Sequence, residues 1–230
     1  MNSLFDTEKD FQSSKDWTGF LKIYDKYFQD YKNKEINILE IGVDKGKSLK
    51  LWRDYFTKAN ICGIDIEKMD FAIKGVELIT ADQTDTKALR QVCEKYKSFD
   101  IIIDDGSHVS KHIITSLNFL FEYLSPGGLY AVEDLQTSYF PRFGGSRVNL
   151  KKKNTSINFL KSIIDSINYE HYNRPFFKNK KFDGLVEYVH FYQNLAILKK
   201  GKSKKIFYTN QKERKNFIEI IKKIVSYFYG

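Results

Sequence analysis

The sequence predicts an α/β protein whose mostly parallel sheet is covered by helices on both faces. Short apolar runs of strand length recur along the first 135 residues, and most of them are separated by segments with helical spacing. Polar residues gather at the carboxyl ends of these runs and are rare elsewhere in them. Strands that are apolar throughout and alternate with helices are typical of a parallel sheet buried on both faces.

Each element is predicted by its local pattern. Apolar runs predict five strands, at 36–43, 59–66, 76–82, 99–106 and 128–135. Helical spacing predicts helices at 16–32, 47–56, 84–96, 109–124 and 155–169. A Ser-Pro-Gly-Gly sequence at 125–128 ends the fourth helix. We expect an irregular loop at 136–150, and two short strands that form a closing hairpin at 186–200.

The positive charge of the chain is concentrated at its carboxyl end. The 230 residues carry a net charge of +9, of which residues 199–230 supply +8 and the other 198 residues +1. A nearly neutral body is not the pattern of a domain that binds nucleic acid across its face, so we expect no nucleic-acid partner. Residues 211–229 have one apolar and one lysine-rich helical face, which favours packing or homo-oligomer formation; contact with an anionic membrane surface is the alternative.

These observations predict three parts: an N-terminal helical segment (1–35), an α/β domain (36–200) and a basic amphipathic C-terminal helix (201–230). Cys62 and Cys93 cannot form a disulfide framework, which indicates buried thiols in a reducing compartment. The chain shows neither a signal peptide nor an apolar run long enough to span a membrane. We therefore expect a cytoplasmic protein.

Polar residues at the ends of the first three strands predict a nucleotide-like cofactor site. Glycines after the first strand let the backbone approach a ligand closely, and the next helix begins there. Asp65 ends the second strand, where a carboxylate can accept both hydroxyls of a ribose. Asp82 and Gln83 follow the third strand and suit the edge of an adenine. The candidate cofactor residues are Glu40, Gly42, Gly46, Ser48, Asp65, Asp82 and Gln83.

This ordered set resembles the class I S-adenosylmethionine-dependent methyltransferases over roughly residues 36–200. Asp44 departs from the G-x-G-x-x-G pattern of nicotinamide enzymes. A structural alternative is that the acidic residues only cap turns. The resemblance implies a Rossmann-like, mostly parallel seven-stranded sheet with an antiparallel C-terminal strand, and S-adenosylmethionine as the cofactor.

A second acidic cluster follows the fourth and fifth strands. Clustered carboxylates raise one another's pKa values unless a cation lies among them. Oxygens from Asp105, Glu133 and Asp134 suit Mg²⁺, which leaves positions open for substrate. His108 lies three residues after Asp105 and is the candidate general base for a hydroxyl that is methylated. A structural alternative for His108 alone is an ordinary loop histidine.

The loop at 136–150 follows the predicted metal site directly. Tyr139, Phe140 and Phe143 are candidates for a wall against a sugar ring, and Gly144 and Gly145 would let the loop move as a lid. An ordinary packed loop is the alternative.

Three longer motifs, IIDDGSH, LSPGGLYAVEDLQTSYFPRFGG and VHFYQNLAILKK, resemble the metal-dependent sugar O-methyltransferases of macrolide biosynthesis. The resemblance implies that Asp105, Glu133 and Asp134 bind Mg²⁺, that His108 is the general base, and that Asp104 lies on the cofactor side. The implied acceptor is a hydroxyl of a sugar or glycosylated metabolite, such as a surface-polysaccharide precursor.

Other acceptors stay open from the sequence alone. A catechol, a phosphate-type oxygen or a nucleic acid held by the basic tail would use the same cofactor. A binding protein for S-adenosylmethionine without catalysis would need a degraded site, but every candidate ligand is present.

Overall fold

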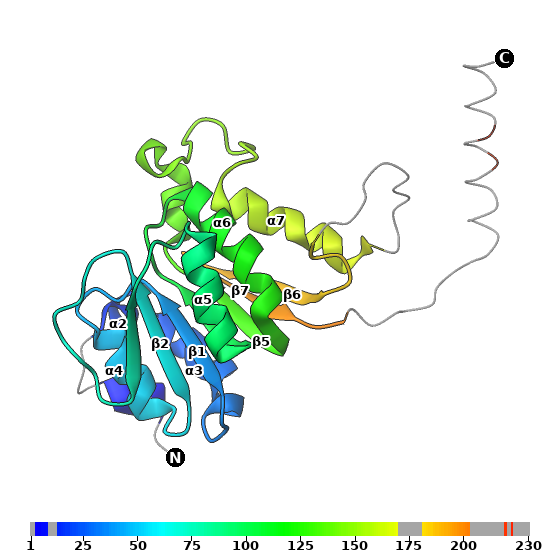
Figure 1. Ribbon diagram of the computed structural model, residues 1–230. Helices are drawn as coiled ribbons and strands as arrows, with labels where there is room; N and C mark the ends of the chain where they lie inside the picture. The colour runs from blue at the N-terminus through cyan, green and yellow to red at the C-terminus, as the bar shows by residue number, and fades with distance from the viewer. Residues whose placement is uncertain (1–2, 9–12, 170–180, 203–218, 220–221, 223–230) are drawn as a thin grey trace.

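The computed structural model describes residues 3–8, 13–169 and 181–202, together with residues 219 and 222. Its centre is a seven-stranded sheet with the order β3-β2-β1-β4-β5-β7-β6 (Figure 1). The strands are β1 (Asn37–Ile41), β2 (Asn60–Asp65), β3 (Val76–Thr80), β4 (Phe99–Asp104), β5 (Leu124–Val132), β6 (Val186–Tyr192) and β7 (Leu195–Lys200). Strands β1 to β5 pair in parallel, and β7 runs antiparallel to both β5 and β6. The predicted sheet and its closing hairpin are thus confirmed.

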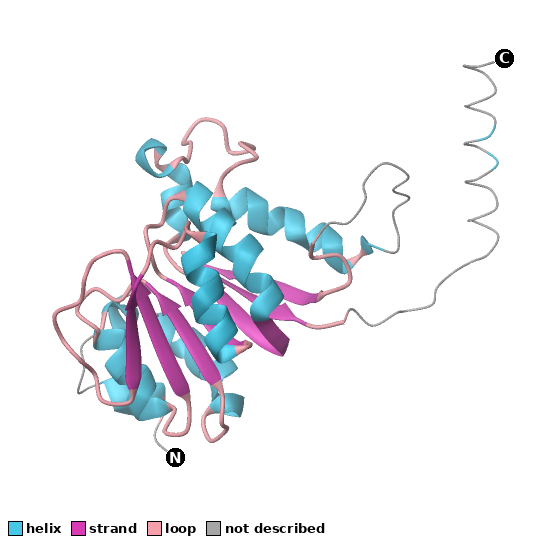
Figure 2. Ribbon diagram, viewed as in Figure 1, coloured by secondary structure: helices cyan, strands magenta, loops and turns pink. Residues whose placement is uncertain are grey.

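Helices cover both faces of this sheet (Figure 2). The α-helices are α1 (Leu4–Glu8), α2 (Ser14–Trp17), α3 (Phe20–Phe28), α4 (Lys47–Tyr55), α5 (Thr86–Tyr96), α6 (Ser110–Leu120) and α7 (Ser156–Ile167). Short 3₁₀ helices are η1 (Gln29–Tyr31), η2 (Phe121–Tyr123), η3 (Leu135–Tyr139) and η4 (Pro141–Phe143).

The two faces are built by alternate residues of each strand. Ile38 of β1 packs with apolar residues of α1, α3 and α4, while its neighbour Leu39 packs with those of α5, α6 and α7. Both side chains are fully buried. Because successive side chains of a strand point to opposite faces, a strand buried on both sides is apolar at most positions, and a buried polar residue such as Glu40 needs hydrogen-bond or ionic partners. This explains the largely apolar runs in the sequence.

The helix predicted at 16–32 is divided in the structure. α2 ends at Trp17, and α3 begins at Phe20 after Gly19, whose φ is +72°. The helical spacing still identified buried residues, since Phe20, Leu21, Tyr24 and Tyr27 all pack in the core. The break changes the direction of the chain just before α3, which separates Lys15 on α2 from the helical pattern that follows.

Cys62 and Cys93 are buried, as predicted, and burial raises the pKa of each thiol to about 12. In the described part of the chain, no helix is both long and apolar enough to cross a bilayer. The amphipathic helix predicted at 211–229 lies outside the described residues, apart from Glu219 and Lys222.

Candidate active site

A cavity of about 660 Å³ opens at the carboxyl ends of the parallel strands. In open α/β sheets this edge is where ligands bind. Among the candidate cofactor residues, five line the cavity: Gly42, Ser48, Asp65, Asp82 and Gln83. Three others, Glu40, Gly46 and Asp104, do not line it. Glu40 and Asp104 are almost completely buried.

Gly42 directly follows β1, at the point where the chain after β1 comes close to the chain after β4. Its φ is +86°, and a Cβ atom at this position would lie 2.2 Å from the backbone oxygen of Asp105. The backbone of Asp105 itself bonds to Ile41, through an N–H to O distance of 2.9 Å. Only glycine therefore allows the β1 and β4 ends to meet at the cavity.

We expect Gly42→Ala to lower the free energy of unfolding by clearly more than the same substitution does at a glycine that has a positive φ but no close neighbour. Gly127→Ala is the matched control, because Gly127 has a φ of +84° and open space around its Cβ position. The left-handed conformation costs alanine about 1–2 kcal/mol at either site, and Gly42→Ala adds the clash with Asp105. Urea unfolding of the two variants measures the difference. Equal free energies of unfolding would contradict the close approach.

Asp65 is held rigidly at the cavity by backbone donors. Its Oδ2 accepts hydrogen bonds from the N–H groups of Val43 at 2.7 Å and Asp44 at 3.2 Å, and Oδ1 accepts one from Glu67 at 2.9 Å. Burial alone would raise the pKa of Asp65, but these backbone hydrogen bonds outweigh it and lower the pKa. The cavity therefore presents an oriented, ionised carboxylate where the sequence predicted a ribose contact.

Gln83 and Asp104 form a buried network that differs from the expected adenine contact. The Gln83 amide nitrogen donates to Asp104 Oδ1 at 3.1 Å, and its Oε1 accepts from the Ser107 N–H at 2.8 Å. Ser116 and Tyr130 donate to Asp104 Oδ2 at 2.7 and 3.2 Å. Both ends of the Gln83 amide are thus used inside the protein. The network fixes the end of β4 against α6.

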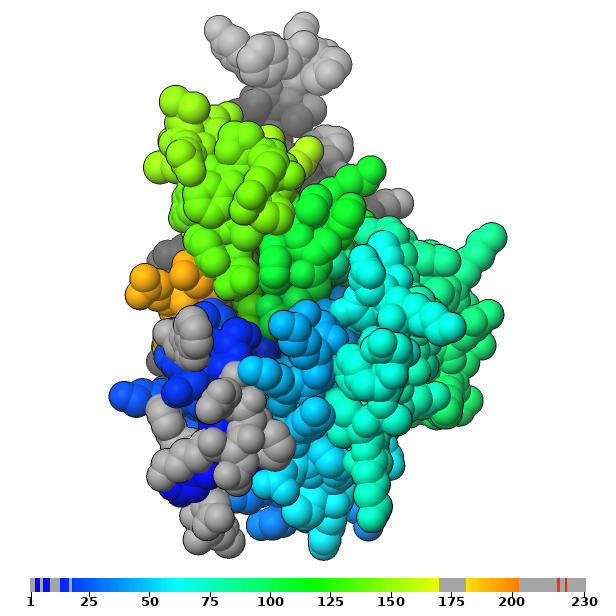
Figure 3. All heavy atoms as spheres, turned by 90° about the vertical axis from the view of Figure 1, so that its left-hand side faces the viewer, coloured from blue at the N-terminus to red at the C-terminus, as the bar shows by residue number. Residues whose placement is uncertain are grey.

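Lys15 is the centre of a buried ionic cluster that the sequence did not predict. Its side chain is fully buried, and Nζ lies 2.7 Å from Glu133 Oε1, 3.0 Å from Asp105 Oδ2 and 3.4 Å from Glu40 Oε1. The Tyr24 hydroxyl also donates to Glu133 Oε1, at 2.6 Å. The N-terminal segment therefore reaches the ends of β1, β4 and β5. Figure 3 shows this segment (blue) beside the residues around β1 and α4 and below the yellow-green loop after β5.

One ammonium group faces three carboxylates in this cluster. Burial disfavours the Lys15 ammonium, but Asp105, Glu133 and Glu40 outweigh it and raise the pKa of Lys15 well above its usual value. Burial, and after it the charge of Asp105, holds the pKa of Glu133 above its usual range despite Lys15. With Lys15 as their cation, the three carboxyl groups thus do not all ionise readily, and a further cation nearby would favour their charged forms.

Asp105, His108 and Asp134 together form a group that suits a metal ion. Each offers one ligand atom, and these atoms lie within 4.8 Å of one another. His108 Nε2 is 3.5 Å from Asp134 Oδ2. Both His108 and Asp134 have positive φ angles, +57° and +52°. Such strained backbone in residues other than glycine is concentrated at functional sites.

Glu133 lies beside this group rather than in it. It is almost completely buried, and its Oε1 accepts hydrogen bonds from both Lys15 and Tyr24. Lys15 forms ion pairs with both Glu133 and Asp105. The three predicted metal ligands therefore lie at one edge of the sheet: Asp105 and Asp134 belong to the candidate metal group, and Glu133 is connected to that group through Lys15.

The three aromatic candidates for substrate contact, Tyr139, Phe140 and Phe143, do not line the cavity. Tyr139 ends η3, Phe143 ends η4 and Phe140 lies between these two short helices, which replace much of the irregular loop expected at 136–150. The loop is nevertheless attached to the site, because Thr137 Oγ1 donates to the His108 carbonyl at 3.0 Å.

The chain was compared with family models, with curated proteins and with solved structures. No family model matches the chain. A demethylmacrocin O-methyltransferase from Streptomyces fradiae is 37% identical over 191 residues, which cover 79% of this chain and 48% of the relative. A mycinamicin VI 2''-O-methyltransferase from Micromonospora griseorubida is 37% identical over 195 residues, which cover 80% of this chain and 48% of the relative.

A solved structure agrees with these relatives. MycE, a methyltransferase from the mycinamycin biosynthetic pathway in complex with Mg and SAH, superposes with a TM-score of 0.83 at 34% identity. The match covers 89% of this chain and 55% of that chain. The chain thus spans about half the length of the curated relatives it matches. It has the class I methyltransferase fold and is a homologue of the sugar O-methyltransferases that the motifs in its sequence resemble.

Proposed function

We propose that this chain is a Mg²⁺-dependent methyltransferase that transfers a methyl group from S-adenosylmethionine to a hydroxyl of a sugar-bearing small molecule. The observation that carries the proposal is the placement of Asp105, His108 and Asp134 at one wall of the cavity that Asp65 and Gly42 also line. The relatives support the same reaction, since one is named a mycinamicin VI 2''-O-methyltransferase and another an 8-demethyl-8-alpha-L-rhamnosyl tetracenomycin-C 2'-O-methyltransferase. We assign residues 36–200 as the methyltransferase domain, with residues 1–35 and 201–230 as its flanking segments.

The cavity fits S-adenosylmethionine through residues that are already oriented. The carboxylate of Asp65 faces the cavity with its conformation fixed by three backbone N–H groups, as ribose hydroxyls require. Gly42 brings bare backbone to the cavity wall. The bound cofactor supplies an electrophilic methyl group on a sulfonium centre. Asp82, Ser48 and Gln83 line the remaining wall on the cofactor side.

The acidic residues fit a hard divalent cation. Asp105 and Asp134 provide oxygens within reach of a single ion, and Glu133 adds a buried carboxylate beside Asp105. Cysteine is absent from this group, and oxygen donors favour Mg²⁺ over softer metals. The cation supplies a Lewis acid that lowers the pKa of an acceptor hydroxyl and fixes its orientation.

His108 is the proposed general base for the acceptor hydroxyl. Its ring lies at the cavity wall, and Nε2 is within 3.5 Å of Asp134 Oδ2. Its Nδ1 is buried and has no hydrogen-bond partner among the described residues. Asp134 therefore orients the ring from one side, and the imidazole is able to accept a proton as the methyl group is transferred.

We expect EDTA to abolish methyl transfer and added Mg²⁺ to restore it, because without the cation no Lewis acid lowers the pKa of the acceptor hydroxyl or fixes its orientation. The assay follows labelled methyl groups from S-adenosylmethionine into a panel of glycosides. Binding of S-adenosylhomocysteine by calorimetry serves as the control, and it should persist in EDTA. Full turnover by the chelated protein would overturn the metal assignment.

A further inference from the structure

The segment after β5 has a charge pattern unlike the rest of the domain. Residues 135–164 contain no Asp or Glu, but they contain six basic residues: Arg142, Arg147, Lys151, Lys152, Lys153 and Lys161. This is a local charge of +6 in a body whose overall charge is close to neutral. The strand-end acids of the cofactor and metal sites lie directly before it, ending at Asp134.

Two arginines of this segment are held in place by aromatic rings. The Arg142 guanidinium lies 4.6 Å from the ring centre of Phe143, and that of Arg147 lies 4.9 Å from the ring centre of Phe140. Both arginines are exposed. Within residues 3–8, 13–169 and 181–202, neither guanidinium has a carboxylate partner. Their N–H groups are therefore free for a ligand, while the aromatic faces limit their motion.

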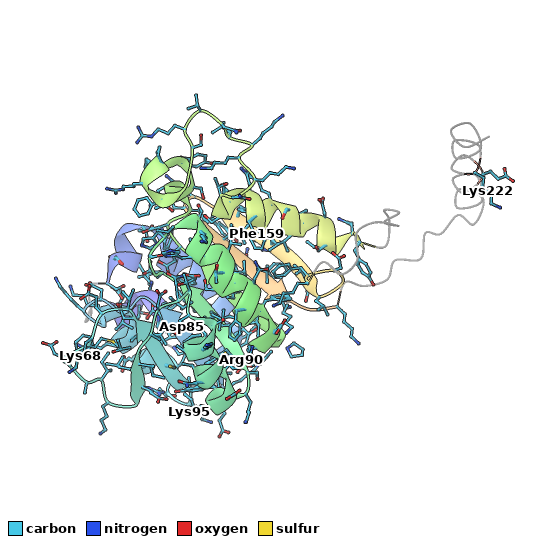
Figure 4. The ribbon with its side chains drawn as sticks, turned by 45° about the horizontal axis from the view of Figure 1, so that its top comes forward. Lys68, Asp85, Arg90, Lys95, Phe159 and Lys222 are labelled. Atoms are coloured by element: carbon cyan, nitrogen blue, oxygen red, sulfur yellow. The ribbon has the colours of Figure 1, made fainter. Side chains whose placement is uncertain are left out.

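The segment is anchored beside the proposed catalytic residues. Thr137 bonds to the His108 carbonyl, and the hydroxyls of Ser138 and Ser156 bond to each other at 2.7 Å. Gly145 is buried, and a Cβ atom there would lie 2.3 Å from the Ser138 carbonyl oxygen. Figure 4 shows the loop above the body, with several of its side chains extending outward. The arginines thus have a fixed base close to His108.

We propose that this loop, through Arg142 and Arg147, binds a phosphate group of the acceptor, so that the methylated hydroxyl belongs to a phosphorylated sugar such as a nucleoside diphosphate sugar. The inference rests on the proposed function and narrows its substrate class. A guanidinium binds phosphate through two parallel N–H···O bonds, a geometry that lysine does not reproduce. The lysines at 151–153 add attraction that falls with salt.

The test measures binding of uridine diphosphate glucose and methyl α-glucoside to the full chain with S-adenosylhomocysteine present. We expect the nucleotide sugar to bind at least tenfold more tightly, and we expect Arg142→Gln/Arg147→Gln to lose at least tenfold of that affinity. Lys34→Gln/Lys58→Gln is the matched control. It removes the same charge from two exposed residues. Lys34 precedes β1 and Lys58 precedes β2, so both lie at the amino ends of the strands, opposite the cavity. Lys34 also faces an aromatic ring, as the two arginines do.

Equal affinity for the two sugars, or equal affinity of the arginine and control variants for uridine diphosphate glucose, would overturn the phosphate proposal. Tighter binding of a single-stranded RNA, lost in the same arginine variant, would overturn it in favour of a nucleic-acid acceptor. S-adenosylhomocysteine affinity and the unfolding temperature of the arginine variant should equal those of the unmodified protein. If the protein binds uridine diphosphate glucose through the arginines but transfers no methyl group, the proposed reaction fails and the phosphate site stands.

Discussion

Lys15→Met should lower the free energy of unfolding by about 3–5 kcal/mol, the usual effect of removing one partner from a buried ion pair. Lys15 is fully buried and contacts Glu133, Asp105 and Glu40 within 3.4 Å. Methionine is similar in length to lysine but leaves these carboxylates without their cation. Urea denaturation in EDTA measures the effect in the metal-free protein. Lys50→Met, an exposed lysine on α4, is the matched control and should change stability by less than about 0.5 kcal/mol.

A second variant separates lost charge from lost packing. In Lys15→Met/Glu133→Gln the unpaired carboxylate becomes a neutral amide, whose oxygen still accepts the hydrogen bond from Tyr24. We expect the double variant to be more stable than Lys15→Met, since the buried charge is removed together with its partner. A double variant that is the less stable of the two would show that Lys15 acts through packing and not through its charge.

The sheet was predictable because strands that are buried on both faces appear in the sequence as short runs of apolar residues. Strands such as β1 and β4 are apolar at most positions, and the polar residues at their carboxyl ends mark where the chain leaves the core. The same logic placed Asp65, Asp105 and Asp134 at one cavity. Local patterns were weaker for the helix at 16–32, where α2 ends at Trp17 and α3 begins at Phe20.

Lys15 is a site residue that no local sequence pattern could have predicted. It lies in the polar sequence Ser13-Ser14-Lys15-Asp16, which has the composition of a solvated turn. Its partners Asp105 and Glu133 are 90 and 118 residues away in the chain. An excess of acidic residues at the strand ends does indicate that some cation belongs there. Only the packing of α2 on the sheet shows that Lys15 is one of the cations at this site.

Gln83 is the reverse case, because its position was predicted but its hydrogen-bond partners were not. The sequence predicted a polar amide at the cofactor site, and Gln83 does line the cavity. Its hydrogen-bonding groups, however, are used by Asp104, Ser116 and Ser107. The residue type and its place in the strand were available from the sequence. Its partners depend on how α6 packs against β4, which the strand-end pattern does not encode.

His108→Asn should reduce turnover by about 10²–10⁴-fold, the usual contribution of a general base. Asparagine is preferred to alanine because His108 has a φ of +57°, a conformation that asparagine adopts readily. The side chain then occupies the same loop without a proton acceptor of comparable basicity. Initial rates at saturating acceptor measure the loss, and KM for the acceptor should change little.

His190→Asn is the matched control, since His190 lies on β6 and bonds to the Tyr27 hydroxyl at 2.6 Å, away from the residues that line the cavity. Its turnover should stay close to that of the unmodified protein. Affinity for S-adenosylhomocysteine should be the same in both variants, because neither residue belongs to the proposed cofactor wall. Undiminished turnover by His108→Asn would remove the base assignment, and Asp105 would become the proton acceptor to test next, because its carboxylate lies in the same group of ligand atoms.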